Sequence, residues 1–296
     1  MLAEVTPHTL DEIAVDYQQA IRWVQQAGFP VDRGRIAEYQ KIISTLCSTF
    51  PAEGWGDLDE PLHRERVCTA LLEIRELISI FKGLSGTGKS EALAGIKHYL
   101  KGPVLQTHED PNNSSNRPRN LGFELYLNAL FAHAGIEPAY GSGADLTFSY
   151  AGRCYFVEAK RPLSGPAAET AARVAKRQLV TRLDSDGNGE AFGLIALDLS
   201  KVINPGNKVM PVRDEAHLFN LMYAEDKRQM QLLSGQILRN AHPRVVGVLL
   251  HYRMLTNFSV TGALNTLKWI GWVPFSEEPA LYEIGERLGK VVRLIC

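Results

Sequence analysis

Three residues near the middle of the chain have the types and spacing needed for metal-assisted chemistry. Asp145 and Glu158 are carboxylates on either side of a predicted turn, and Lys160 follows Glu158 by two positions. Two acids placed side by side repel each other unless a proton or a cation lies between them. A hard divalent ion prefers oxygen ligands and keeps several waters, and a lysine beside such a water could orient or deprotonate it. The three residues therefore predict a site for Mg²⁺, with Mn²⁺ as a possible substitute.

A hairpin is predicted to bring these residues together. Two alternating runs flank Ala151 and Gly152, which suit a two-residue turn because glycine accepts positive φ. With this turn, Asp145 lies opposite Glu158, and opposed residues of an antiparallel pair share one face, with Cβ atoms about 4.5–5.5 Å apart. Lys160 projects from the same face because strands have a period of two. The alternative is a solvated strand face on which Glu158 and Lys160 form a surface ion pair of little energetic value.

The elements around the hairpin predict an α/β fold with a mixed sheet. Their order is helix, three strands, helix, strand, helix and strand. The predicted elements are a helix at 121–134 capped by Gly135, an extended stretch at 137–140, the hairpin, a helix at 169–183, a buried strand at 191–198, a helix at 214–240 and a buried strand at 244–252.

The first third of the chain has a different pattern. From Thr9 to Leu100 apolar residues recur every three or four positions, which indicates helices. The segment Lys101–Asn120 is rich in Pro, Asn, Ser and Asp, as loops and linkers are. We therefore predict a helical N-terminal region at 1–102, a linker at 103–120 and an α/β domain at 121–296.

The hairpin sequence GADLTFSYAGRCYFVEAKR resembles the catalytic hairpin of the PD-(D/E)XK, or restriction-endonuclease-like, nuclease superfamily. Asp145 matches the aspartate of the motif, and Glu158 to Lys160 match (D/E)-x-K. Ala144 stands where the family name has proline. The resemblance implies a restriction-endonuclease-like αβββαβ core with a mixed sheet in the α/β domain at 121–296, which would then be a nuclease-like domain preceded by the helical N-terminal region.

The resemblance also implies further site residues on the flanking helices. Glu124 is similar in position to an acid that often joins the metal site of the family, and Gln178 to a polar residue that often contributes from the next helix. The implied catalytic residues are Asp145, Glu158, Lys160, Glu124 and Gln178, and the implied metal ligands are Asp145, Glu158 and Glu124. Gln178 is followed four positions later by arginine, where some branches of the family have tyrosine.

Basic residues near the hairpin could neutralise phosphates of a nucleic acid. The candidates are Arg161, Arg173, Lys176, Arg177 and Arg182, with Arg117 and Arg119 in the preceding loop. For each of them the alternative is the solvated face of a helix.

The function implied by the resemblance is that of a Mg²⁺-dependent endonuclease, a phosphodiesterase that hydrolyses DNA. In this reading two carboxylates hold the metal and Lys160 positions the attacking water. The alternative is a non-catalytic module that binds nucleic acid or protein on the same fold. A homodimer would suit an enzyme that makes paired cuts.

An ATPase is disfavoured although two short motifs point to one. Gly83 to Ser90 match the phosphate-loop pattern, but such a loop joins a buried strand to a helix, and the residues before Gly83 have helical periodicity. The string DEAH begins at Asp214 after a stretch containing Pro211, which argues against a buried strand there. We predict instead that Asp214 caps a helix.

Composition and charge set broad limits. The 296 residues include 32 Lys and Arg against 33 Asp and Glu, so the net charge of -1 does not indicate a nucleic-acid or membrane partner. The N-terminus carries acids where a secretory signal is basic and then apolar, and no run approaches the roughly 18 apolar residues of a membrane span. The four cysteines form no C-x-x-C pair. We therefore expect a cytoplasmic protein without membrane contact, and DNA is the partner that the resemblance implies.

Overall fold

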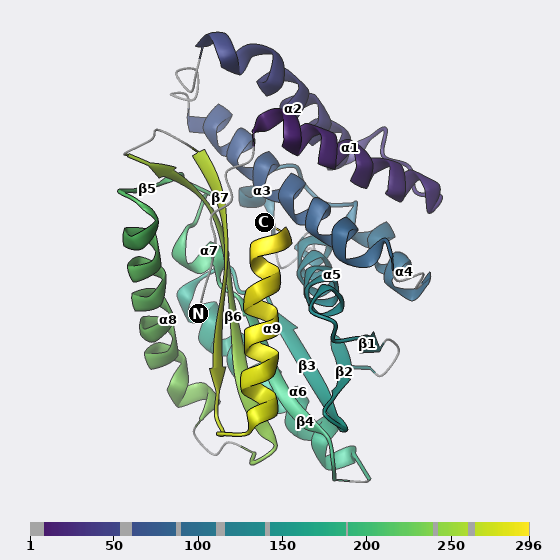
Figure 1. The fold of residues 1–296 in the computed structure, drawn as a ribbon, viewed down its shortest axis with the longest axis vertical. Coiled ribbons are helices and arrows are strands. Elements are labelled where there is room, and N and C mark those ends of the chain that lie inside the picture. Colours follow the sequence, from purple (N-terminus) through teal and green to yellow (C-terminus); the bar gives the residue numbers. More distant parts are fainter. Residues whose placement is uncertain are drawn as a thin grey trace.

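A mixed β-sheet lies at the centre of the protein, and helices cover both of its faces (Figure 1). The computed structural model describes residues 9–53, 61–86, 90–110, 116–139, 143–187, 189–238, 242–259 and 264–295. Within these ranges the sheet has seven strands. The predicted α/β class, the mixed sheet and the helices at the N-terminal end are confirmed.

The N-terminal region is helical, as the periodicity between Thr9 and Leu100 predicts. Its helices are α1 (Leu10–Gln26), α2 (Gly34–Glu53), α3 (Pro61–Leu84) and α4 (Ser90–Tyr99). The first helix begins with a capping box, because the Thr9 hydroxyl accepts a hydrogen bond from the Glu12 amide and the Glu12 carboxylate accepts one from the Thr9 amide. None of the helices in the described ranges combines the length and apolar character needed to cross a membrane.

The predicted order of elements after the linker is confirmed. The elements are α5 (Arg117–His133), β1 (Pro138–Ala139), β2 (Leu146–Tyr150), β3 (Arg153–Lys160), α6 (Gly165–Ser185), β4 (Phe192–Asp198), α8 (Glu215–Ile237) and β6 (Val245–Phe258). Gly135 follows α5 with φ of 69°, as expected for a helix-ending glycine. Two helices begin earlier than predicted. Arg117 opens α5 inside the stretch predicted as loop, and Ser164 caps α6 by accepting a hydrogen bond from the Ala167 amide.

Several elements were not predicted. They are the 3₁₀ helix η2 (Gln106–His108), α7 (Ser200–Ile203), β5 (Met210–Val212), β7 (Leu264–Pro274) and α9 (Pro279–Ile295). β7 pairs antiparallel with β6, which ends six residues later than predicted. α9 packs its apolar side on the same core as the N-terminal helices.

The sheet combines antiparallel and parallel pairing. Its strand order is β1-β2-β3-β4-β6-β5, with β7 also on β6. The first three strands are antiparallel, whereas β3, β4 and β6 run parallel. β5 pairs parallel with the far end of β6. The parallel arrangement places the carboxyl ends of β3 and β4 at one edge of the sheet, where functional residues of open α/β sheets often lie.

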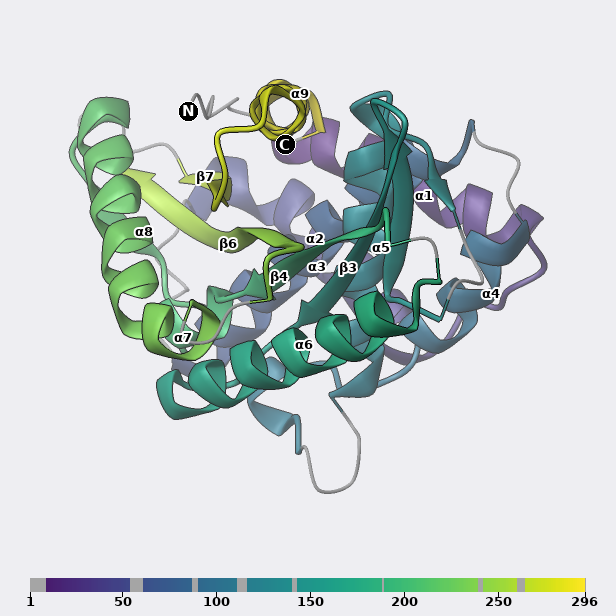
Figure 2. The same ribbon diagram turned by 90° about the horizontal axis from the view of Figure 1, so that it is seen from below.

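Both faces of the central strands are buried. In β4, Leu194 and Ala196 face the core formed with α3, α5 and α9, while Ile195 and Leu197 face the core formed with α6 and α8. Figure 2 shows α9 and α6 on opposite sides of the sheet. This double burial explains why β4 reads as an unbroken apolar run.

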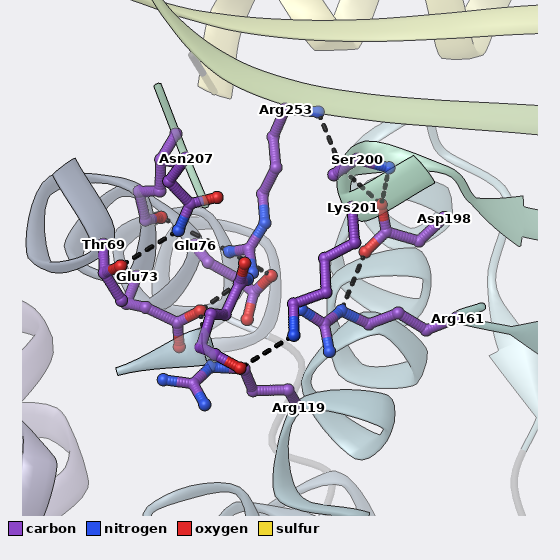
Figure 3. A network of polar contacts seen from close by, with 12 residues as sticks. Thr69, Glu73, Glu76, Arg119, Arg161, Asp198, Ser200, Lys201, Asn207 and Arg253 are labelled. Atoms are coloured by element: carbon purple, nitrogen blue, oxygen red, sulfur yellow. Dashed lines mark hydrogen bonds and ion pairs between the residues drawn. The ribbon is translucent and has the colours of Figure 1, made fainter. Parts of the chain in front are cut away.

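A buried network of charged side chains joins α3 to the sheet (Figure 3). The Glu73 carboxylate accepts hydrogen bonds from three arginines: Arg35 at 2.9 Å, Arg119 at 3.0 Å and Arg253 at 2.8 Å. Although burial raises the pKa of Glu73, the guanidinium groups hold it well below its ordinary value. One turn later, Glu76 pairs with Arg253 at 2.7 Å. The network therefore connects residues 180 positions apart, in α3 and β6.

The same network reaches the carboxyl ends of β3 and β4. Glu109, just before α5, accepts hydrogen bonds from three cations: Arg119, Arg161 and Lys201. Arg161 also donates to Asp198 at 3.2 Å, and the Ser200 hydroxyl donates to the other oxygen of Asp198. The stretch predicted as a linker is thus tied to the strand that carries Lys160.

A second buried acid lies between α8 and the other face of the sheet. Asp226 accepts a hydrogen bond from the Trp269 indole at 2.8 Å. Gly271 of β7 faces the same carboxylate, and a Cβ at this position would collide with it. Burial raises the pKa of Asp226 from its ordinary 3.8 to about 6.

Replacing Asp226 with asparagine is expected to change how stability depends on pH. Because the native pKa lies above the unfolded one, the native state binds the proton more tightly, and wild-type stability falls as pH rises from about 4 to about 6. Each pKa unit corresponds to about 1.4 kcal/mol, so the charge costs about 2–3 kcal/mol at pH 8. Urea unfolding should show the Asp226→Asn variant gaining this amount relative to wild type between pH 4 and 8. Burying the asparagine amide has a cost that does not depend on pH, so it changes the free energy of unfolding equally at pH 4 and pH 8. A difference between variant and wild type that stays the same across this range would contradict the prediction.

Candidate functional site

The hairpin that carries the predicted site forms with the predicted turn. Tyr150 lies opposite Arg153, and Phe148 lies opposite Tyr155. Ala151 and the following glycine have φ of 50° and 76°. Positive φ at both turn residues matches the right-handed twist of the flanking strands. The predicted register is therefore confirmed.

The hairpin brings Asp145, Glu158 and Lys160 together. Asp145 lies one residue before β2, next to the last ladder pair. Its Oδ2 accepts hydrogen bonds from the Ala159 amide at 2.8 Å and from Lys160 Nζ at 3.1 Å. Lys160 Nζ also donates to Glu158 Oε2 at 3.2 Å and to the Ala159 carbonyl at 3.0 Å. The ammonium group thus bridges the two carboxylates.

The three side chains lie on the face of β3 that looks toward α6. Alternate residues of the strand, including Val157 and Ala159, enter the opposite core under α5. The Glu158 side chain is only 1% exposed, whereas that of Lys160 is 23% exposed. The site therefore has a buried acid at its base and a lysine that reaches solvent.

A third carboxylate, Glu124 of α5, influences this site. Burial raises the pKa of Glu124 to about 7, and Asp145 and Glu158 act in the same direction, while Lys160 opposes them. Burial and the Asp145 charge also raise the pKa of Glu158. Two carboxylates, Glu124 and Glu158, whose pKa values the Asp145 charge raises form with it an electrostatic environment that a cation would stabilise. Glu124 therefore lies close enough to Asp145 for the charge of Asp145 to raise its pKa.

The donor set fits a hydrated hard cation better than a closed metal cage. In the part of the chain that the structure describes, no three His, Cys, Asp or Glu side chains converge as a ready-made metal site. Mg²⁺ commonly binds through one or two carboxylates and keeps several waters. Asp145 and Glu158, with Glu124 nearby, offer oxygen ligands of this kind. Both oxygens of Glu158 already have cationic partners, so an ion that binds this carboxylate competes with their positive charge.

The second partner of Glu158 is Arg182 of α6. Its Nε donates to Glu158 Oε1 at 2.7 Å. A Cβ at Gly143, just before Asp145, would lie 3.1 Å from the Arg182 guanidinium. Arg182 also lines a pocket of about 270 Å³ on α6 with Arg177, Gln178 and Thr181. This guanidinium therefore links the carboxylates to the surface of α6.

Gln178 lies beside the site and not within it. It is exposed and lines the α6 pocket next to Arg182. Among the described residues, the side chains that hydrogen bond to Asp145 and Glu158 are those of Lys160 and Arg182.

The residues predicted to contact nucleic acid differ in their exposure. Arg173 and Arg177 are exposed on α6, and Lys176 and Arg182 are partly exposed. Arg161 is not at the surface: its side chain is 1% exposed and pairs with Asp198 and Glu109. The positive charge of Arg161, which we predicted to contact nucleic acid, is therefore paired with acids of the buried network. Arg119, also suggested for phosphate contacts, is buried in the same network.

Among the residues that the structure describes, neither segment that resembles an ATPase motif follows a long buried strand. A helix, α3, leads into Gly83, and a Cβ at this glycine would lie 2.5 Å from the Ala129 carbonyl. The glycine therefore allows α3 and α5 to pack closely; residues 87–89 of the motif lie outside the described residues. At the DEAH string, Asp214 caps α8 by accepting a hydrogen bond from the His217 amide at 2.8 Å. The preceding β5 is a strand of only three residues whose Pro211 is exposed, so it is not the buried strand against which the sequence argued.

Two parts of the site were not anticipated. The first is the contact of Arg182 with Glu158; a signal was available, because Arg182 follows Gln178 by four positions and the two share one side of the helix. The second is Glu109, which holds the residue after Lys160 in place through Arg161. Its segment reads as linker, and nothing local marks it as buried.

Comparison with known proteins gives no relatives from which to assign this site. No protein-family model, curated protein or solved structure was found to match the chain. A function for this site must therefore be inferred from the residues and geometry of the chain itself.

Proposed function

We propose that the protein is a Mg²⁺-dependent nuclease that hydrolyses phosphodiester bonds in DNA, built on a restriction-endonuclease-like αβββαβ core. The observation that carries the proposal is the position of the Lys160 ammonium, 3.1 Å from Asp145 and 3.2 Å from Glu158. The hairpin order, the helices on either side and the (D/E)-x-K spacing support the likeness to the PD-(D/E)XK superfamily.

The residues of the site have complementary roles in this proposal. Asp145 and Glu158 would hold the metal, with Glu124 as a further oxygen ligand. When bound, a divalent ion lowers the pKa of a coordinated water and offsets charge on a phosphate. Lys160 would orient the attacking water, and its ammonium would stabilise negative charge that develops on the phosphate. The Ala159 amide keeps Asp145 turned toward the lysine.

DNA is the substrate that the surroundings favour. Arg173 and Arg177 are exposed on α6, the helix that covers the site face of β3. Such residues neutralise backbone phosphates without reading sequence.

A cleavage assay with a ligand-site variant tests the proposal. We expect the wild-type protein to cut plasmid, linear or single-stranded DNA with Mg²⁺ or Mn²⁺ and to stop cutting in EDTA. Asp145→Asn should lower the rate ~10²-fold or more, because losing a metal ligand removes several kcal/mol of transition-state stabilisation. The amide oxygen of this variant can still accept the Ala159 hydrogen bond, so folding should be retained. Cleavage that persists in EDTA would refute the metal-dependent mechanism.

One observation favours a second candidate, a nucleic-acid-binding module without turnover. Lys160 and Arg182 together occupy both oxygens of Glu158, so the chain neutralises this acid with its own cations. DNA binding without cleavage of any substrate, unchanged in Asp145→Asn, would favour the module over the enzyme.

A further inference from the structure

Arg182 occupies a carboxylate that the proposed metal also needs. The Glu158 carboxylate is buried, and its Oε1 accepts the Arg182 hydrogen bond while its Oε2 faces Lys160. A divalent ion that coordinates Glu158 comes close to the positive charge of both partners, so metal binding competes with these contacts. This step rests on the proposed function, since it concerns the same metal.

The partner that yields more easily is Arg182. Lys160 is held by three acceptors, namely Asp145, Glu158 and the carbonyl of Ala159, and it extends from the same strand as Glu158. Arg182 comes from a different element, its contact with Glu158 is through Nε, and its side chain is 28% exposed. Only the guanidinium end of this pair can regain water, because the Glu158 side chain is 1% exposed. A bound divalent ion would supply the positive charge that the buried carboxylate loses.

A destination for the released side chain lies beside it. The α6 pocket has a volume of about 270 Å³, several times the roughly 30 Å³ that a water molecule occupies in the liquid. The hydroxyl of Thr181 already donates to the Arg177 carbonyl. The other side-chain donors among the lining residues are the nitrogens of Arg177, Gln178 and Arg182. A guanidinium presents five N–H donors in a planar fork that suits phosphate oxygens. The chemistry of the pocket is that of a phosphodiester subsite.

We propose that Arg182 is a two-position side chain. Without metal it holds Glu158; when a divalent ion takes Glu158, it turns into the α6 pocket and binds a backbone phosphate of the substrate. The two events are thermodynamically linked, because the metal and the phosphate both favour the position of Arg182 in the α6 pocket. Each ligand therefore strengthens the binding of the other. Metal binding therefore tightens nucleic-acid binding, and nucleic acid tightens metal binding.

The first measurement is Mn²⁺ binding to the full chain without DNA, by isothermal titration calorimetry. Arg182→Ala removes the competitor, so we expect its Kd for Mn²⁺ to fall by at least ~5-fold, the lower end of typical coupling effects. Arg177→Ala is the matched control, because Arg177 lines the pocket and does not bond to Glu158. Its Kd for Mn²⁺ should equal that of wild type. Arg182→Gln provides a second variant with a similar side-chain length, and thermal melts check that all variants are folded.

The second measurement separates the two roles of Arg182 by cleavage kinetics. Both Arg182→Ala and Arg177→Ala should raise KM for DNA, because both remove a phosphate contact, but only the former should bind Mn²⁺ more tightly. A wild-type protein that binds Mn²⁺ with the same Kd as Arg182→Ala and Arg182→Gln would overturn this inference and leave the metal site intact. Absence of Mn²⁺ binding to every variant would instead overturn the proposed function, and this inference with it.

Discussion

Replacing Lys160 with alanine is expected to lower the rate of DNA cleavage by ~10²–10⁴-fold, the range for loss of a positioned proton-transfer or charge-stabilising group. The expectation follows from the position of Nζ, which lies within 3.2 Å of both carboxylates. The loss should be in kcat, because the ammonium acts on the water and on the developing charge. Single-turnover cleavage of a plasmid at saturating protein measures this step directly.

Lys227→Ala provides the control for general loss of positive charge. Lys227 lies on α8 over the ring of Tyr223, in a helix that does not carry the site. Its cleavage rate should match wild type. A Lys160→Ala protein that is folded and cuts DNA at the wild-type rate would remove the lysine from the mechanism.

The largest expected effect on stability is that of Glu73→Ala. The change leaves three buried guanidinium groups without the carboxylate that they share: those of Arg35, Arg119 and Arg253. Breaking a buried ion pair by removing one partner typically costs about 3–5 kcal/mol, a large part of the roughly 5–15 kcal/mol that stabilises a folded protein. Urea unfolding should show a free energy of unfolding that is lower by this amount, with a correspondingly lower midpoint, or no cooperative transition at all.

Glu38→Ala is the matched control at the surface. Glu38 pairs with Lys41 and Arg66 on exposed positions of α2 and α3. Exposed pairs contribute about 0–1 kcal/mol, so this variant should unfold close to wild type. Equal midpoints for Glu73→Ala and Glu38→Ala would mean that the buried network does not stabilise the fold.

The hairpin could be predicted from the sequence because its determinants are local. A two-residue turn with glycine fixes the register, and the register together with the strand period fixes which side chains share a face. Asp145, Glu158 and Lys160 are therefore found together from residues within one hairpin. The order of helices and strands that follows was also visible in the periodicity. α9 carried a readable signal as well, since its buried residues recur at helical spacing.

The buried network could not be predicted, because its partners are far apart in the chain. Glu73 and Glu76 on α3 have the spacing of a solvated helix face, and only the packing of α3 on the sheet reveals that they are buried. β7 was missed for a related reason. It holds Asn265 and Lys268, which are buried, and polar residues interrupt the apolar pattern by which a buried strand is recognised. Arg161 was misassigned to the nucleic-acid surface, because no local sequence feature shows whether an arginine that follows a strand faces solvent or pairs with a buried acid.

The separation between Glu73 and Arg253 also has a consequence for biosynthesis. Ribosomes add roughly 5–20 residues per second, so about 10–40 s pass between the synthesis of these two residues, 180 positions apart. During this interval α3 has no β6 against which to bury its acids. The N-terminal helices can therefore reach their final packing only after β6 has been synthesised, and until then their exposed apolar surface is open to molecular chaperones.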